Sequence, residues 1–209
     1  MKYRVILWDW NGTLADGMEA SLKSTNDILA RRNMPPISRE QYYSYIDTPI
    51  SRFYEHLFDL NEVTMEIIGQ EFYESYPKHF QSLHQGVEAL LAQLQTAGVR
   101  QVILTSGNTQ VVDGYLRRFG IREHFESILG ADDLLATSKV ERGIAWMQNQ
   151  QIPAREAIML GDTLHDYDVA KAMGIDCILF SGGHQSRRDL QKAGVPLVDS
   201  FEEFRKYLF

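Results

Sequence analysis

The chain has 209 residues, of which 44% are hydrophobic and 23% charged, and its formal net charge is −7. This is ordinary globular composition, long enough for one domain of normal size with a smaller insertion. The acidic balance and the absence of a Lys/Arg run argue against a nucleic-acid partner, and no apolar stretch approaches the roughly 20 residues of a membrane span.

The first predicted element is a buried strand within the stretch Arg4 to Leu14. Its Val/Ile/Leu/Trp run is typical of a strand that is covered on both faces, as in a parallel sheet. The run ends at Asp9, and the chain turns through Asn11-Gly12-Thr13. A carboxylate at the carboxyl end of such a strand lies where open α/β sheets bind ligands. On this stretch alone, Asp9 and Asn11 could equally serve only to shape the turn.

Residues 15–84 are predicted to form helices and turns only. Helices are expected over 18–32, after Ser38, over 51–58 and over 64–80, with breaks at Pro35-Pro36 and Thr48-Pro49. Because no convincing strand falls in this span, we expect a helical insertion.

From Gly86 onward, strands and helices alternate. Strands are expected at 101–105, 127–129, 157–160, 176–180 and 197–198, and helices at 87–97, 109–119, 139–150, 165–173, 187–192 and 201–208. This alternation predicts an α/β fold with a doubly wound parallel sheet, formed by residues 1–14 and 85–209. Right-handed crossovers would place Asp9, Thr105 and Asp162 along one edge of that sheet.

Residues that could take part in binding or catalysis are predicted to lie on this edge. Thr105-Ser106-Gly107-Asn108 offers hydroxyls and free backbone N–H groups to an anion, where a strand gives way to a helix. Lys139 begins a helix, and Asp162 and Asp166 stand four residues apart in Gly161-Asp162-Thr163-Leu164-His165-Asp166. Together with Asp9 they would be costly as unpaired buried charges.

A hard cation would satisfy the three carboxylates. Mg²⁺ fits best, because it takes few protein carboxylates and keeps waters and a substrate phosphate oxygen. Lys139 and the Thr105 hydroxyl could hold the other phosphate oxygens, and Asp9 could be both metal ligand and covalent nucleophile.

Plainer interpretations stand beside these. Asp162 and Asp166 could be partners of a helix N-terminus, and Lys139 could be a surface lysine. Some neighbouring residues are interpreted as loop, packing or surface residues: Asp133, His165 and His184.

In this order, the motifs resemble those of the haloacid dehalogenase-like superfamily. Asp-x-Asn-Gly-Thr at 9–13, apolar-Thr-Ser-Gly at 104–107, Lys139 and Gly-Asp-Thr-x-x-Asp at 161–166 are similar to the motifs of its phosphoglycolate phosphatase and β-phosphoglucomutase group. The resemblance covers essentially the whole chain, and residues 15–84 correspond to the helical cap of that group.

The resemblance implies a phosphatase with an aspartyl-phosphate intermediate. Asp9 would attack phosphorus, Thr105 and the Ser106-Gly107 segment would bind the phosphoryl group, and Lys139 would hold both. The substrate class would be a small phosphorylated metabolite.

The resemblance also implies a metal and a specificity domain. Mg²⁺ would be held by Asp9, Asp162, Asp166 and the main-chain carbonyl of Asn11. The cap would choose the substrate. Within it, Arg52 and His56 are our candidates for touching the substrate because they follow the break at Thr48-Pro49, and the plainer interpretation is that they are surface residues of a cap helix.

Asn11 departs from the family pattern, which usually has Asp at this position as general acid and base. An amide can donate a hydrogen bond but cannot exchange a proton at neutral pH. General acid–base catalysis contributes about 10²- to 10⁴-fold, so we predict a slow phosphatase or one whose acid and base come from elsewhere, such as the cap. The alternatives left open are a phosphomutase, a phosphonate-cleaving relative, and a low-turnover phosphate-binding regulatory module.

The remaining expectations concern the environment of the protein. The single cysteine, Cys177, excludes an intrachain disulfide and is interpreted as a small buried hydrophobe. The amino-terminal segment lacks the charged and apolar regions of an export signal. We therefore expect a cytoplasmic protein with no membrane partner, and a monomer is the default expectation.

Overall fold

The computed structural model describes residues 2–80, 82–131 and 138–209. The strands are β1 (Val5–Trp8), β2 (Arg100–Asn108), β3 (Ser127–Ala131), β4 (Ala157–Gly161), β5 (Asp176–Phe180) and β6 (Leu197–Val198). The α-helices are α1 (Met18–Ala30), α2 (Arg39–Tyr45), α3 (Ser51–Glu55), α4 (Met65–His79), α5 (Val87–Thr96), α6 (Thr109–Arg118), α7 (Lys139–Asn149), α8 (Leu164–Met173), α9 (Arg187–Leu190) and α10 (Phe201–Leu208). Short 3₁₀ helices are η1 (Arg122–His124), η2 (Ala154–Glu156) and η3 (Gln191–Ala193).

The strands form one parallel sheet in the order β3-β2-β1-β4-β5-β6. β1 lies in the middle, with Trp8 opposite Ile103 on one side and Leu160 on the other. The predicted doubly wound α/β fold is thereby confirmed. β2 and β3 continue past their predicted ends, because a register shift after Leu104 allows Asn108 to pair with Ala131.

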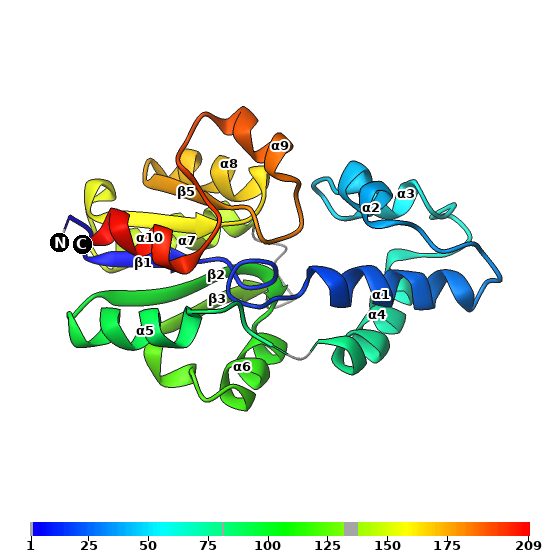
Figure 1. Ribbon diagram of the computed structural model, residues 1–209, viewed down its shortest axis with the longest axis horizontal. Coiled ribbons are helices and arrows are strands. Elements are labelled where there is room, and N and C mark those ends of the chain that lie inside the picture. Colours follow the sequence, from blue (N-terminus) through cyan, green and yellow to red (C-terminus); the bar gives the residue numbers. More distant parts are fainter. Residues whose placement is uncertain (1, 81, 132–137) are drawn as a thin grey trace.

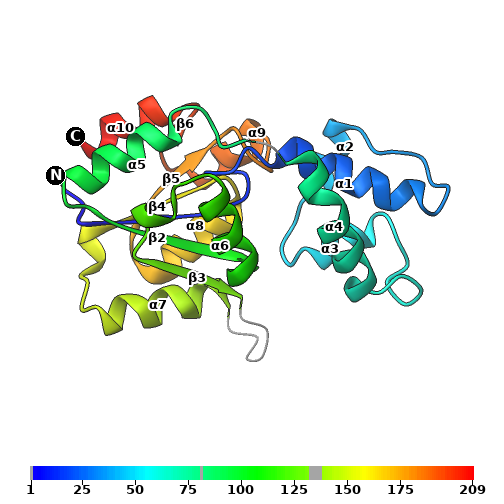
Figure 2. The same ribbon diagram turned by 90° about the horizontal axis from the view of Figure 1, so that it is seen from below.

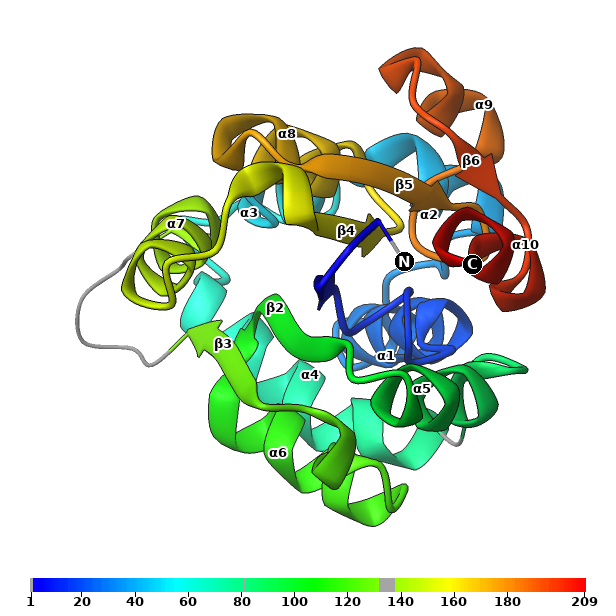
Figure 3. The ribbon, with the colours of Figure 1, turned by 90° about the vertical axis from the view of Figure 1, so that its left-hand side faces the viewer.

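Both faces of the sheet are covered by helices, as Figure 3 shows looking along the molecule. Ile6 and Trp8 point into a hydrophobic cluster that includes residues of α5, α6 and α10. Val5 and Leu7 point into a second cluster with residues of α7, α8 and α9. This alternation follows from the period of two along a strand, and it explains why β1 is apolar at every position.

Helices α1 to α4 form a separate body at the end of the core opposite the two termini (Figures 1 and 2). It has a hydrophobic cluster of its own, which includes Ile28, Phe53 and Ile68. The helix predicted over 51–58 ends at Glu55, because Leu57 and Phe58 both donate to the Tyr54 carbonyl in a closing turn. The separate cluster supports the predicted cap at 15–84, whose boundaries stay a prediction.

The two segments that join the cap to the core lie side by side. Ala15 pairs with Leu83 in an antiparallel bridge. The Asp16 N–H donates to the Ser82 carbonyl at 3.1 Å, and the His84 N–H donates to the Leu14 carbonyl at 3.0 Å. The chain therefore leaves and re-enters the core through one hydrogen-bonded pair.

Two smaller expectations can be compared with the fold. Cys177 lies in β5 and is buried, in agreement with its interpretation as a small hydrophobe. Across the described ranges, none of the helices combines the length and the apolar character that crossing a membrane would need.

Candidate active site

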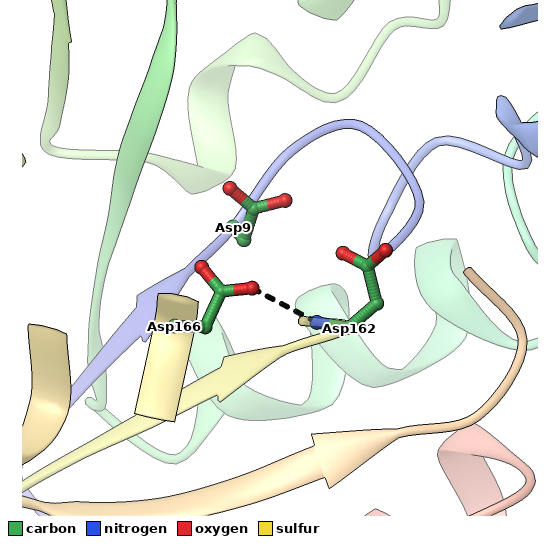
Figure 4. Close-up of side chains that lie close together, drawn as sticks. All are labelled: Asp9, Asp162 and Asp166. Atoms are coloured by element: carbon green, nitrogen blue, oxygen red, sulfur yellow. Dashed lines mark hydrogen bonds between the residues drawn. The ribbon is translucent and has the colours of Figure 1, made fainter. Parts of the chain in front are cut away.

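Three aspartates converge at the edge of the sheet that faces the cap (Figure 4). Asp9 directly follows β1, Asp162 directly follows β4, and Asp166 lies in the first turn of α8. Each offers a carboxylate oxygen, and these oxygens lie within 4.8 Å of one another. The parallel topology brings them together, because the carboxyl ends of neighbouring strands share one edge.

Lys139 lies between two of these carboxylates. Its Nζ is 2.6 Å from Asp9 Oδ1 and 2.6 Å from Asp166 Oδ1, and only 2% of its side chain is exposed. It is therefore not a surface lysine. Burial alone would lower the pKa of the ammonium, but the charges of Asp166 and Asp9 outweigh burial and raise it.

The local sequence places Lys139 at this point. Ser138 caps α7 through a capping box, in which its hydroxyl accepts from the Glu141 N–H and the Glu141 side chain accepts from the Ser138 N–H. A cation in the first turn of a helix is unfavourable by itself, because that end carries a partial positive charge. The two carboxylates offset this and fix the side chain in the cluster.

Asp166 has two functions in the structure. Its Oδ2 accepts hydrogen bonds from the Asp162 N–H at 3.1 Å, the Thr163 N–H at 3.0 Å and the Thr163 hydroxyl at 2.7 Å. The bond from the Thr163 N–H forms the capping box of α8 together with the bond from the Asp166 N–H to the Thr163 hydroxyl at 3.4 Å. The helix-terminus interpretation therefore applies to Asp166 together with its place in the cluster. Burial opposes its ionisation, but Lys139 and these hydrogen bonds lower its pKa.

Asp162 is fully enclosed. Its Oδ1 accepts from the Thr13 hydroxyl at 2.8 Å, and its Oδ2 accepts from the His184 N–H at 2.7 Å. Gly12, which has φ +94°, and Gly183 press against it, because a Cβ at either position would lie 2.2 or 2.1 Å from Asp162 Oδ2. Thr13 and His184 are contacts that the sequence did not assign, although both belong to the glycine-rich segments that resemble the family.

The carboxylates carry more negative charge than Lys139 balances. Burial raises the pKa of Asp9 to about 6 in spite of Lys139. Burial, with the charges of Asp9 and Asp166, raises the pKa of Asp162 well above its ordinary value. A buried, all-oxygen donor set with excess negative charge fits a hard divalent cation, and of these Mg²⁺ is the one that is usually held by one or two carboxylates beside a phosphate.

The last residues of β2 supply polar groups to the pocket that Asp9 also lines. The Thr105 hydroxyl accepts from the Gly107 N–H at 3.0 Å, and Asn108 caps α6 by accepting from the Gln110 and Val111 N–H groups. The Arg142 guanidinium donates to the Thr105 carbonyl at 2.8 Å. Sequence reasoning missed Arg142, although it follows Lys139 by three residues and so shares its side of α7.

The Asn11 side chain is directed to the cap. Its Oδ1 accepts from the Tyr76 hydroxyl at 2.7 Å, and its Nδ2 lies 3.4 Å from the Ser21 hydroxyl, to which it donates. A Cβ on Gly17 would lie 1.8 Å from Asn11 Oδ1, so only glycine leaves room for the amide there. The residue that would exchange protons in the family is thus an amide held by two cap hydroxyls.

A pocket of about 690 Å³ lies between this edge and the cap. Of the predicted site residues, the following line it: Asp9, Asn11, Thr105, Ser106, Gly107, Lys139, Asp162 and Asp166. Arg52 and His56 are not among the described lining residues. Arg52 lies 3.4 Å from Asp47, and the His56 ring stacks on Tyr45 at 4.5 Å.

The two histidines beside the motifs do line this pocket. The His184 ring exchanges a hydrogen bond of 2.9 Å with the Tyr42 hydroxyl of the cap, so its packing also joins the two bodies. Burial lowers the pKa of His165 and lowers that of His184 to about 4, so His184 is neutral at pH 7. Asp133 lies outside the described residues.

The site has the features of one class of α/β phosphohydrolase. They are a carboxylate after the first strand, a buried lysine beside it, an acidic cluster after β4 and an inserted helical cap. The match to a family agrees with this class. The chain belongs to the haloacid dehalogenase-like hydrolases, whose family model matches residues 6–180.

The chain is also similar to individual proteins of known sequence or structure. It is 31% identical to the tyrosine-protein kinase PtkA of Mycobacterium tuberculosis, over 98% of this chain and 72% of PtkA. It is 24% identical to the phosphoglycolate phosphatase of Pseudomonas savastanoi, over 98% and 78% of the two chains. A crystal structure of mutant CbbY from Rhodobacter sphaeroides with xylulose-(1,5)bisphosphate matches with a TM-score of 0.79 and 27% identity, over 96% of each chain. The predicted superfamily and the predicted HAD-like phosphatase type of enzyme are confirmed.

Proposed function

We propose that the chain hydrolyses a small organic phosphomonoester through an aspartyl-phosphate on Asp9. The observation that carries the proposal is the contact between Lys139 and Asp9 at the floor of the pocket, where the Nζ is 2.6 Å from Oδ1. A buried cation beside a carboxylate favours the ionised nucleophile and would also neutralise charge on an entering phosphoryl group.

The chemistry has two steps. In the first, an Asp9 oxygen attacks phosphorus, the ester P–O bond breaks, and the leaving oxygen keeps the electron pair. In the second, water attacks the phosphorus of the acyl phosphate, and inorganic phosphate leaves as Asp9 is restored. Over both steps one water is consumed, with one of its protons ending on the alcohol. Lys139, the Thr105 hydroxyl and the Ser106 N–H hold the phosphoryl oxygens, so catalysis is mainly positioning and charge neutralisation.

Asp9, Asp162, Asp166 and the main-chain carbonyl of Asn11 would hold Mg²⁺. When bound, the ion supplies charge stabilisation for the phosphoryl oxygens. The excess negative charge of the carboxylate cluster supports this part of the proposal.

Asn11 makes the reaction dependent on the leaving group. Without a proton donor at this position, an alkoxide must leave unprotonated or take its proton from water. The rate of hydrolysis should be reduced least for esters of acidic alcohols and phenols, whose leaving groups need no proton. We therefore propose a slow phosphatase whose turnover falls steeply as the leaving group becomes more basic.

A second candidate function is phosphoryl transfer to a hydroxyl acceptor. The 31% identity to a protein named tyrosine-protein kinase is the reason to test it. Asn11 does not favour a phosphomutase, since that reaction also uses an acid and base at this position.

The test is hydrolysis of p-nitrophenyl phosphate by wild type and by the isosteric variant Asp9→Asn, each with EDTA and with excess Mg²⁺. We expect turnover only in wild type with Mg²⁺, with melting curves showing that both proteins are folded. Turnover that survives Asp9→Asn contradicts the aspartyl-phosphate. Phosphate binding without turnover would instead identify a regulatory binding module.

Transfer is separated from hydrolysis by incubating the protein with γ-³²P-labelled ATP and a tyrosine-containing peptide. Label on the peptide that depends on Asp9 supports the transferase, and release of labelled phosphate alone supports the hydrolase. The monomeric state and the cytoplasmic location stay predictions.

A further inference from the structure

The cap contributes a mainly apolar wall to the pocket. Phe53, Ile68 and Phe72 line it, and the first two are buried. Ile50 and Tyr73 also line it, yet they are 50% and 52% exposed. Large apolar side chains that are left in water around a concave site mark the place where a ligand buries apolar surface.

The same wall has almost no charge. Among the described cap residues that line the pocket, Asp47 alone is charged, and its sign is negative. The lining lysine and arginine, Lys139 and Arg142, both lie on α7 in the core, next to Asp9 and Thr105. The two lining histidines are likewise on the core side. Among the described lining residues, cationic side chains are thus present at the phosphoryl end of the pocket and absent from the end that would receive the leaving group. Arg52 lies outside this lining and is paired with Asp47 at 3.4 Å.

This separation limits the substrates that fit. A second phosphate or a carboxylate on the leaving group would enter an apolar wall with Asp47 as its charged neighbour, and would lose hydration without gaining a partner. A neutral aromatic or aliphatic group would gain from burial against Phe53, Phe72 and Tyr73.

We infer that the leaving group is uncharged and largely apolar, so that the preferred substrates are monophosphates of neutral alcohols or phenols, and not phosphorylated acids or bisphosphates. The inference rests on the proposed function for the position of the phosphoryl group. It separates this chain from relatives whose names specify phosphoglycolate, a phosphorylated acid.

The first test compares kcat/KM for phenyl phosphate and 3-carboxyphenyl phosphate. The two leaving groups have the same ring and similar acidity, so the ratio isolates the charge. We expect phenyl phosphate to be preferred by about tenfold or more, since like-charge contacts and unpaired charges reduce affinity by at least this factor. We also expect 2-phosphoglycolate to be a poor substrate.

The second test changes the wall. Ile50→Lys adds a cation at the pocket, and Ile67→Lys adds the same cation at a cap isoleucine that is 43% exposed and does not line it. We expect Ile50→Lys to move the ratio toward 3-carboxyphenyl phosphate by about tenfold, the size of one favourable charge pair, and Ile67→Lys to leave it at the wild-type value.

Failure of the inference and failure of the proposed function give different results. If wild type hydrolyses the carboxylated ester as well as phenyl phosphate, the inference is wrong and the phosphatase stands. If no ester is hydrolysed, calorimetric binding of the same two esters to Asp9→Asn still decides the inference: equal or tighter binding of the carboxylated ester overturns it, and preferential binding of phenyl phosphate supports it.

Discussion

Replacing Asn11 by Asp would restore the missing proton carrier with almost no change in shape. In the structure Asn11 Oδ1 accepts from the Tyr76 hydroxyl at 2.7 Å, and an aspartate keeps that bond. The Ser21 hydroxyl, which accepts from Nδ2 at 3.4 Å, can rotate and donate to the new oxygen. The variant should therefore fold normally, and a change in rate can be assigned to proton transfer.

The expected gain follows from two opposing effects. General acid–base catalysis contributes about 10²- to 10⁴-fold. Against this, the Tyr76 bond to a carboxylate is stronger than to an amide by about 1.4 kcal/mol, which holds the new group toward the cap and costs about tenfold. We therefore expect Asn11→Asp to increase kcat for an alkyl phosphate by roughly 10- to 10³-fold.

The assay is steady-state phosphate release from phenethyl phosphate and from p-nitrophenyl phosphate, at saturating Mg²⁺. The gain should be large for the alkyl ester and small for the nitrophenyl ester, whose leaving group needs no proton. Asn11→Asp combined with Tyr76→Phe should recover the tenfold that the tyrosine withholds. A rate that is unchanged or lower, or a gain equal for both esters, refutes the reasoning that the missing proton limits the enzyme.

Three further predictions concern the buried charges. Lys139→Met leaves two buried carboxylates without their cation and should reduce the free energy of unfolding by about 3–5 kcal/mol in urea titrations, whereas a loss below about 1 kcal/mol would mean that the ion pairs are not buried in solution. Mg²⁺ at 100 times its Kd should stabilise wild type by about 2.7 kcal/mol in thermal melts and should not stabilise Asp162→Asn, and an equal shift in both proteins would place the ion elsewhere. Burial lowers the pKa of His184 from 6.5 to about 4, so between these pH values the unfolded chain binds a proton that the folded chain does not. The free energy of unfolding should therefore fall by up to about 3 kcal/mol as the pH drops from 6.5 to 4. His184→Asn, which can retain the bond to Tyr42, should lack this component when its pH–stability curve is subtracted from that of wild type.

The residues at the carboxyl edge of the sheet could be predicted from the sequence, because the order and direction of the strands determine their position. Once β1, β2 and β4 are recognised as parallel strands, Asp9, Thr105 and Asp162 must fall on one edge, whatever the details of packing. Lys139 could be chosen because it begins a helix of the same alternation, and the resemblance to the family added its contact with the nucleophile. Its burial between Asp9 and Asp166 became clear only in the structure.

The contacts between cap and core could not be predicted in this way. The bond from Tyr76 to Asn11 joins residues that are 65 positions apart, and the bond between Tyr42 and His184 joins residues that are 142 apart. Both depend on how the helical body sits on the sheet, which is decided by side-chain shape and not by periodicity. Arg52 is a candidate from the sequence because it follows Thr48-Pro49, where the helical pattern is interrupted. It lies outside the described pocket lining, because its position also depends on how the cap packs on the core.

The paired segments at Leu14–Asp16 and 82–84 have a consequence for the architecture of the family. The chain leaves the core and returns to it through two segments that are paired by a single antiparallel bridge. The cap is therefore attached to the core like the loop of a β-hairpin, through two adjacent segments. The helices between these two segments can lengthen, shorten or be exchanged without changing the distance between the two points where the chain enters the core. In this architecture the cap helices can change while Asp9 keeps its place after β1. Asn11 is a core residue whose side chain would be affected by such a change, because it is bonded to Tyr76 and Ser21.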